Sequence, residues 1–204
     1  MPRPKRAILL TCVLAVAVLG CGPEPAADLQ VERLPDVRPN LPAVPTIPPP
    51  PHPVQHGDGS YTIYGLRKQI RRTIDTDVEV TGYIVEIYQP PECPEGETCP
   101  RPIAPHLWVA DTRGESDAAK RLVVVGYAMN HEEYNEAREL GDRYEPPPPE
   151  SGMIPIPIDF EVGNKVKISG RFSRVSGLGF NYSEGLLEYR GHTTLEAQTP
   201  TEGS

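Results

Sequence analysis

The sequence has little positive charge. Its 204 residues include 20 Lys and Arg against 28 Asp and Glu, which gives a net charge of −8. Arg3, Lys5 and Arg6 lie in a segment that we expect to be removed, which leaves 17 basic against 28 acidic residues and a charge of −11. Proteins that bind nucleic acid generically do so by neutralising phosphates with basic side chains. The charge therefore argues against a nucleic-acid partner.

The sequence also lacks the motifs of common catalytic and cofactor sites. It has no Gly-x-Ser-x-Gly elbow, no phosphate-binding loop and no paired zinc ligands. The segment His131-Glu-Glu-Tyr-Asn135 only imitates a zinc-protease motif, because Asn135 stands where the second His belongs. Asp111 and Glu188 are isolated carboxylates, and an Asp at a strand end more often caps a turn than acts as a base. We therefore predict no enzyme activity, no catalytic residue, no metal and no cofactor.

No apolar run is long enough for a membrane helix, which needs about 20 residues. The longest run spans residues 7–19 and follows three basic residues, as in an export signal. Residues 18–21, Val-Leu-Gly-Cys, resemble the lipobox of bacterial lipoproteins, in which the Cys is acylated and becomes the first residue of the mature protein. We therefore predict a signal peptide at 1–20 and lipidation, with palmitate among the chains, at Cys21. A plain secretory signal or an uncleaved N-terminal anchor is the alternative.

Lipidation implies a place in the cell envelope. Three acyl chains in the mature lipoprotein pattern anchor a protein stably, whereas one chain gives only marginal binding. In the class that the segment resembles, Gly22 after the Cys usually accompanies sorting to the outer membrane. We expect a lipid-anchored protein of the bacterial envelope, at the outer membrane rather than the inner one, with its domain in the periplasm or at the cell surface.

Only four cysteines are present. Cys12 leaves with the signal and Cys21 carries the lipid, so Cys93 and Cys99 remain, in an oxidising compartment. We predict a disulfide between them, and closing so short a loop stabilises a fold by roughly 2 kcal/mol. The alternative is a metal site that adds His106, although the spacing fits no paired Cys-x-x-Cys pattern.

Proline is abundant. Of the 26 prolines, eleven lie between Gly22 and His56, where almost no periodic apolar pattern occurs, so this stretch builds no core. As polyproline II, at ~3.1 Å per residue, it would hold a domain up to roughly 100 Å from the lipid. The predicted organisation is a signal peptide at 1–20, a lipidated Cys and disordered linker at 21–56, a folded domain at 57–195 and a disordered tail at 196–204.

The folded part combines short β-branched segments with two helical patterns. Thr62 is placed to cap a short helix, and Asn130 and Gly141 are placed to begin and end a second one. In the first predicted strand the apolar phase switches just after Gly82, which suggests a bend or bulge, and Gly170 has the matching position in the fourth. Strands are predicted at 78–88, 106–111, 122–126, 166–172 and 185–189.

The order strand, strand, strand, helix, strand, strand resembles the OB-fold, a five-stranded Greek-key barrel. Four segments are similar to the strand signatures of bacterial OB-domains of the tRNA-anticodon-binding-like and nucleic-acid-binding-like superfamily. They are Val78 to Ile84, Val109 to Asp111, Val162 to Phe172 and Glu184 to Tyr189. The resemblance covers about residues 61–195 and implies a mainly β barrel, with one helix between strands 3 and 4 and a short N-terminal helix. It specifies barrel geometry rather than function.

OB-domains bind ligands along their second and third strands, between the loops that join strands 1 to 2 and 4 to 5. The resemblance makes Trp108, Arg174, Phe180 and Tyr182 the candidate ligand-binding residues, because aromatic faces stack on bases or sugars. The alternative is that Trp108 plugs the barrel and Phe180 closes its end. A cleft predicts exposed aromatic side chains, whereas a scaffold permits buried ones.

We expect a membrane-anchored, non-catalytic binding or scaffold module whose partner is an envelope protein or a glycan. The alternative is an oligonucleotide- or oligosaccharide-binding domain that uses the face of strands 2 and 3. Membrane contact is expected through the lipid anchor alone, because no second hydrophobic span follows residues 7–19.

Overall fold

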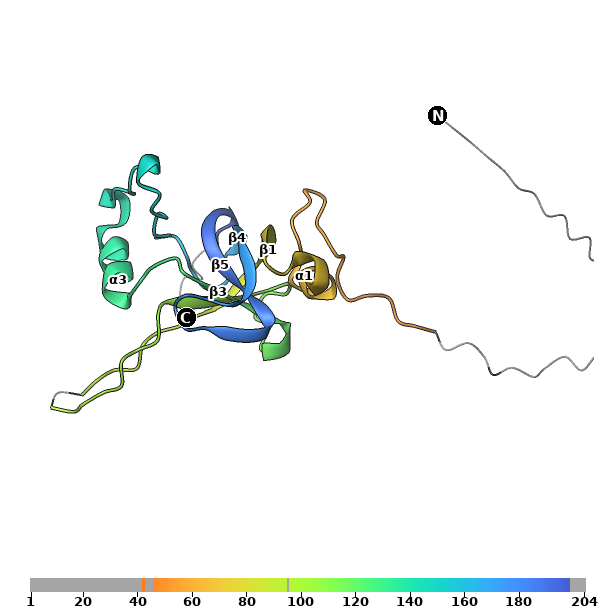
Figure 1. Ribbon diagram of the computed structural model, residues 1–204, viewed down its shortest axis with the longest axis horizontal. Coiled ribbons are helices and arrows are strands. Elements are labelled where there is room, and N and C mark those ends of the chain that lie inside the picture. The colour runs from red at the N-terminus through yellow and green to blue at the C-terminus, as the bar shows by residue number, and fades with distance from the viewer. Residues whose placement is uncertain (1–41, 43–45, 95, 199–204) are drawn as a thin grey trace, which may run out of the picture. The chain divides into compact units, whose positions relative to one another are not determined.

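The computed structural model describes residues 42, 46–94 and 96–198 (Figure 1). The chain divides into two compact units, Met1–Ile47 and Pro48–Ser204, and every described helix and strand lies in the second. The predicted signal peptide, the lipidation at Cys21 and most of the predicted linker lie outside the described residues. Within the described part of the chain, no helix has the length and apolar character needed to cross a membrane.

Five strands form one mixed sheet that closes into a ring in the order β1-β2-β3-β5-β4. All neighbouring pairs are antiparallel except β3 with β5, which is parallel. The mainly β architecture is therefore confirmed, and each predicted strand has its counterpart. The strands are β1 (Thr76–Ile87), β2 (His106–Ala110), β3 (Arg121–Val125), β4 (Lys165–Val175) and β5 (Asn181–Glu196).

The interior of the ring is filled by apolar side chains that alternate with outward-facing ones along each strand. Each fully buried large apolar side chain stabilises the fold by roughly 1.5–3 kcal/mol, so this interior cluster is the main source of stability. Tyr127, Phe160 and Tyr189 pack edge to face within it, with ring centroids 5.6 to 6.3 Å apart. The cluster also includes Val80, Leu107, Val124, Phe172 and Leu187, one from each strand.

Gly82 and Gly170 allow neighbouring backbones to approach closely. A Cβ atom added at Gly82 would lie 2.8 Å from the carbonyl oxygen of Ala110, and one at Gly170 would lie 2.3 Å from that of Glu188. Both ladders are irregular, β1 against β2 after Ile84 and β4 against β5 at Gly170. The predicted bend in β1 is therefore present, although the register shifts after Ile84 rather than directly after Gly82.

Two short helices precede the ring. The first, α1 (Ile63–Lys68), begins at Thr62, whose hydroxyl accepts the backbone N–H of Gly65, as the sequence predicted. The second, α2 (Ile70–Thr73), follows after a break at Gln69, so the predicted helix is divided in two.

The third helix, α3 (His131–Leu140), connects β3 to β4 and has the predicted ends, Asn130 and Gly141. Two reciprocal hydrogen bonds stabilise its first turn. Asn130 Oδ1 accepts the Glu133 N–H over 2.8 Å, and Glu133 Oε2 accepts the Met129 N–H over 3.0 Å. Short 3-10 turns lie at Ala118–Lys120, Gly141–Arg143 and Pro149–Ser151.

The packed chain extends past the expected domain boundaries at 57 and 195. The Thr62 N–H donates to the Val54 carbonyl over 3.2 Å. At the other end the Gln198 N–H donates to Asn164 Oδ1 over 2.7 Å. The last residues of the predicted linker and the first residues of the predicted tail therefore contact the domain.

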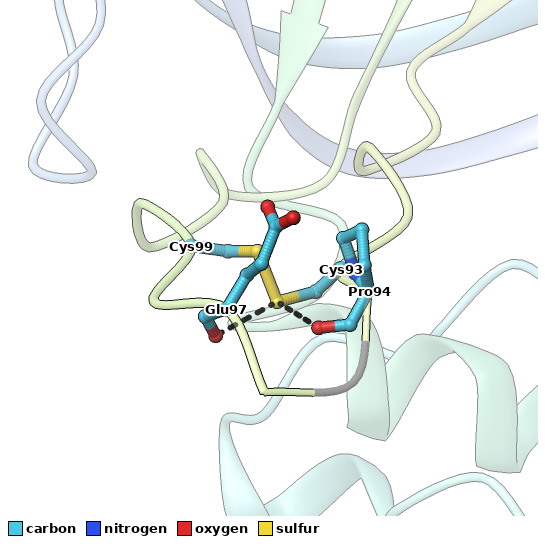
Figure 2. The surroundings of a disulfide bond; sticks show 4 residues. All are labelled: Cys93, Pro94, Glu97 and Cys99. Atoms are coloured by element: carbon cyan, nitrogen blue, oxygen red, sulfur yellow. Dashed lines mark hydrogen bonds between the residues drawn. A yellow bond between two sulfur atoms is a disulfide. The ribbon is translucent and has the colours of Figure 1, made fainter.

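A disulfide closes part of the long loop between β1 and β2. The sulfur atoms of Cys93 and Cys99 lie 2.12 Å apart and their Cα atoms 5.9 Å apart, so the predicted pairing is confirmed (Figure 2). The carbonyl oxygen of Glu97 lies 3.7 Å from Cys93 Sγ, within the closed loop. Because the two cysteines are bonded to each other, they are not the free thiolates that a metal site with His106 requires. Figure 1 shows this yellow-green loop leading away from the sheet.

Candidate functional site

The outer face of β2 and β3 carries Trp108. Side chains alternate along a strand, so Trp108 points outward while Leu107 and Val109 point into the interior cluster. Across the sheet, Trp108 lies between Glu86 of β1 and Val123 of β3. Trp108 is therefore not a plug of the ring.

Apolar side chains on this face form a second cluster, which we name the outer cluster. Its members come from β2, β3, β5, the long loop between β1 and β2, and the short loop between β4 and β5. The sequence resemblance indicated β2, β3 and these two loops, and the structure adds β5, which contributes Leu186 and Tyr182. The buried members are Val123, Val125, Phe180 and Leu186, and the half-buried members are Ala104, Trp108, Leu178 and Tyr182.

The loop between β4 and β5 covers part of the outer face. It is closed by a tight turn, in which the Ser176 N–H donates to the Phe180 carbonyl over 3.0 Å and the Gly179 N–H donates to the Ser176 carbonyl over 3.1 Å. Gly179 has a φ of +87°, in the left-handed region that favours glycine. The turn holds Phe180 on the sheet, where it is only 7% exposed.

Trp108 and Tyr182 form the open part of the outer cluster. Their rings meet edge to face with centroids 5.5 Å apart, and both residues are half-buried. Burial raises the pKa of the Tyr182 hydroxyl, which stays neutral and able to donate a hydrogen bond. Arg174 is exposed, and its Nε donates to the Ser183 carbonyl over 3.1 Å. The structure therefore gathers three of the four predicted residues into one cluster and leaves Arg174 outside it.

His106 extends the aromatic packing beneath this face as a buried ring, and sequence reasoning did not include it among the binding residues. Its ring stacks on Tyr88 with centroids 4.6 Å apart, and Phe180 meets it edge-on at 5.0 Å. Burial lowers the pKa of His106, so the ring is neutral at pH 7, and its Nδ1 donates to the Ala104 carbonyl over 2.9 Å. The two-residue spacing between His106 and Trp108 was the available signal, because alternate residues of a strand share a face.

The basic group nearest to Trp108 in the strand register is already paired. Arg121 Nη1 lies 2.7 Å from Glu86 Oε2, in an ion pair that joins β3 to β1. Its Nε also donates to the Glu115 carbonyl over 2.7 Å. The guanidinium is therefore engaged by protein groups and is not free to bind a phosphate.

A separate hollow of about 490 Å³ lies between α1 and the chain that follows β2. Asp111, at the end of β2, accepts the backbone N–H groups of Ile63 and Tyr64 over 2.7 and 2.8 Å. Arg67 donates to two backbone carbonyls near the start of β3 and lies 3.4 Å from Glu184. These contacts hold α1 on the ring. Asp111 therefore caps a helix and is not a free base.

A chain of hydrogen bonds joins Tyr189, His192 and Asp159. The Tyr189 hydroxyl lies 2.8 Å from His192 Nδ1, and His192 Nε2 lies 2.8 Å from Asp159 Oδ1. The bond from His192, together with one from Thr194 over 2.6 Å, lowers the pKa of Asp159 to about 2. Tyr189 is only 4% exposed and burial raises its pKa, so its hydroxyl is closed to a substrate. These hydrogen bonds connect the segment that precedes β4 with strand β5.

Among the residues that the structure describes, no group of three or more His, Cys, Asp and Glu side chains is placed to hold a metal ion. No protein-family model and no curated protein matches this sequence. The geometry and charge of the outer face are therefore what point to a function.

Proposed function

We propose that this protein is a lipid-anchored component of the bacterial envelope. Its ring is an OB-type barrel that binds an envelope protein or a glycan, without catalysis, through the outer face of β2 and β3. The observation that carries the proposal is the half-buried pair of Trp108 and Tyr182 on that face. Aromatic rings with one open side provide a large apolar contact area and a polar edge, which is why they are frequent at recognition surfaces.

The strand order supports the OB-type assignment. In an OB-fold five strands form a Greek-key barrel, and here β1 pairs with both β2 and β4 while β5 lies between β3 and β4. The helix α3 lies between β3 and β4 in the chain, as the resemblance implies. The strands and loops that OB-domains use for ligands contribute most of the outer cluster, and β5 contributes Leu186 and Tyr182.

Charge and shape favour a protein or a glycan over a nucleic acid. From Cys21 onward the chain has 17 basic and 28 acidic residues, so a polyanion would be repelled. Arg121, beside the aromatic pair in the register, is held by Glu86. The turn at Phe180 covers part of the face and leaves a short aromatic patch, whereas a strand of nucleotides needs a longer track.

An oligosaccharide or oligonucleotide bound along the same face is the second candidate. The observation that favours it is that half-buried aromatic rings lie at both ends of a row of ring contacts, Trp108 and Tyr182 at one end and Tyr88 at the other, with the buried rings of Phe180 and His106 between them. Sugars and bases both stack on aromatic rings that have an open face. Binding that weakens steeply with salt would indicate the oligonucleotide, because it depends on phosphate contacts.

The membrane anchor is proposed from residues 18–21 and from the proline-rich stretch after them. A lipid at Cys21 and a spacer of extended chain would present the domain at a distance from the membrane without any chemistry of its own. Labelling cells with alkyne-tagged palmitate tests the anchor. We expect label on the protein that is lost in Cys21→Ser, and an unlabelled wild-type protein would contradict the proposal.

The test of binding is chemical crosslinking in intact envelopes, followed by affinity capture and mass spectrometry. The full chain is compared with Tyr182→Ser, with Tyr64→Ser and with a chain that ends at His56. Tyr64 is also half-buried but lines the separate hollow, so Tyr64→Ser removes a similar ring from a different surface.

We expect one envelope component to be recovered with the full chain and with Tyr64→Ser, and to be absent with the chain that ends at His56. Its recovery should fall by about fivefold or more in Tyr182→Ser, since aromatic residues dominate the energy of most interfaces. Equal recovery with both tyrosine variants would mean that the outer face is not the binding surface.

A further inference from the structure

An apolar groove of about 500 Å³ lies between α3 and the proline-rich segment that follows it. The segment is held in place partly by the Tyr144 hydroxyl, which accepts the backbone N–H of Ile156 over 3.1 Å. The volume is within the range of sites that bind small ligands or peptide side chains, roughly 300–1,000 Å³. The apolar lining consists of Ala137, Tyr144, Pro147 and Ile156, which are buried or half-buried, and of Leu140, Met153 and Ile154, which are exposed.

The exposed apolar residues of this groove are adjacent in space rather than scattered. Leu140, Met153 and Ile154 are 38%, 63% and 39% exposed and line one groove. Single exposed apolar side chains are normal on a protein, whereas contiguous ones with a polar rim mark interaction sites. Methionine adapts its shape to different partners, which suits a groove that receives the side chains of another chain.

The groove is bordered by an excess of negative charge. Residues 131–154 contain seven acidic residues and two arginines, a net charge of −5. In the described part of the chain, none of the seven forms an ion pair with Lys, Arg or His. Glu133, Glu136 and Glu145 line the groove itself, together with one basic residue, Arg143. A local excess of carboxylates over basic groups favours a cationic partner.

The same charges exclude other occupants. The described carboxylates do not form a group that would hold a metal ion. An anionic membrane surface would repel a region with a net charge of −5. A purely apolar ligand would make no favourable contact with Glu133, Glu136 and Glu145, which form the acidic rim of the groove.

We propose that the groove binds a basic amphipathic peptide segment of a partner protein. Apolar side chains of the segment would fill the groove beside Leu140, Met153 and Ile154, and its Lys and Arg residues would pair with the acidic rim. This is the mode in which an amphipathic helix places its apolar anchors in a groove. The groove shares no residue with the outer cluster, so this interaction is independent of the function proposed above.

Fluorescence anisotropy with a labelled synthetic peptide tests the proposal. The peptide contains only leucine and lysine in an amphipathic helical pattern, and a scrambled peptide of the same composition is its control. The protein is the full chain in four forms. They are the wild type, Met153→Ser with Ile154→Ser, Glu136→Gln with Glu145→Gln, and Glu79→Gln with Glu161→Gln.

The last pair is the matched control, because Glu79 and Glu161 are exposed, lie outside the groove and form no ion pair in the described chain. All substituted positions are exposed, so far-ultraviolet circular dichroism should show that every variant stays folded. We expect saturable binding that weakens about tenfold in the Met153 and Ile154 variant and about fivefold in the Glu136 and Glu145 variant, with less than about a twofold change in the control.

Any one of three results would overturn the proposal. One is that the wild type does not bind the amphipathic peptide saturably. Another is that the scrambled peptide binds equally well, which would show attraction to net charge alone. The third is that the control pair weakens binding as much as the groove pairs do.

Discussion

The two aromatic clusters of the ring differ in how far they are enclosed. In the interior, Phe160 is fully buried and contacts the rings of Tyr127 and Tyr189 edge to face. On the outer face, Phe180 is buried by a turn of the same chain, whereas Trp108 and Tyr182 are only half-buried. The same residue types therefore stabilise the fold in one place and remain available for contact in the other.

The difference arises from what covers each cluster. The closed sheet and the segments packed on it enclose the interior aromatic side chains, so the burial of these side chains cannot change without unfolding of the protein. On the outer face, the loop that contains Ser176 and Phe180 is a single turn closed by hydrogen bonds, and it covers only part of the cluster. The following substitutions test this contrast, beginning with the largest expected effect.

Removing an interior ring should destabilise the protein most. Phe160→Ala deletes a fully buried side chain that also packs against His192, so we expect a loss of about 3–5 kcal/mol in the free energy of unfolding. Urea denaturation followed by circular dichroism measures it. A loss below about 1 kcal/mol would mean that the interior is not closely packed.

Removing the covering ring should cost less and expose the tryptophan. For Phe180→Ala we expect a loss of about 2–3 kcal/mol, because the loop can relax into the space. Trp108 is the only tryptophan, so acrylamide quenching of its fluorescence should increase in the variant. Unchanged quenching would show that the loop does not shield Trp108.

The hydrogen-bonded chain at Asp159 should make stability depend on acidity. The pKa of the Asp159 carboxyl falls from 3.8 to about 2 on folding, so the ionised carboxylate stabilises the folded state above about pH 4. This contribution disappears as the pH falls toward 2. Asp159→Asn should lower the free energy of unfolding by about 1 kcal/mol at pH 7, since the group is half exposed. Thermal unfolding from pH 7 to pH 2 should show the two curves converging, and a constant difference would contradict this account.

Removing a hydroxyl from the interior should have the smallest effect. The Tyr127 hydroxyl is buried with no hydrogen-bond partner among the described residues, so Tyr127→Phe should leave stability within about 0.5 kcal/mol or increase it. Calorimetric melting of the variant provides the measurement. A loss above about 1 kcal/mol would reveal a partner for the hydroxyl.

Local signals in the sequence predicted much of the fold. Asn130 and Gly141 mark the two ends of α3, and Thr62 caps the start of α1. These ends could be predicted because capping depends on residues within one helical turn. Cys93 and Cys99 could be paired by elimination once Cys12 and Cys21 were assigned to the predicted signal peptide and the predicted lipid anchor. The length of β5 was missed, because its end is polar and is fixed by pairing with β4.

The site was predicted only in part, for a similar reason. The alternation of side chains along a strand places Trp108 and His106 on one face. The packing of Phe180 and Tyr182 on that face joins residues more than 70 positions apart in the sequence, which no local pattern specifies. The bond between Asp159 and His192 joins residues 33 positions apart, and neither residue belongs to a recognisable motif. The acidic groove depends on how the proline-rich segment lies against α3, which composition does not specify.

The proposed function requires the outer face of β2 and β3 to be the recognition surface. Photo-crosslinking in living cells tests this requirement, with a benzophenone amino acid placed at Tyr182 in one strain and at Tyr64 in another. We expect a discrete crosslinked product to an envelope protein or glycan from position 182 and none from position 64, because only Tyr182 belongs to the outer cluster. A product from position 64 and none from position 182 would contradict the proposed function.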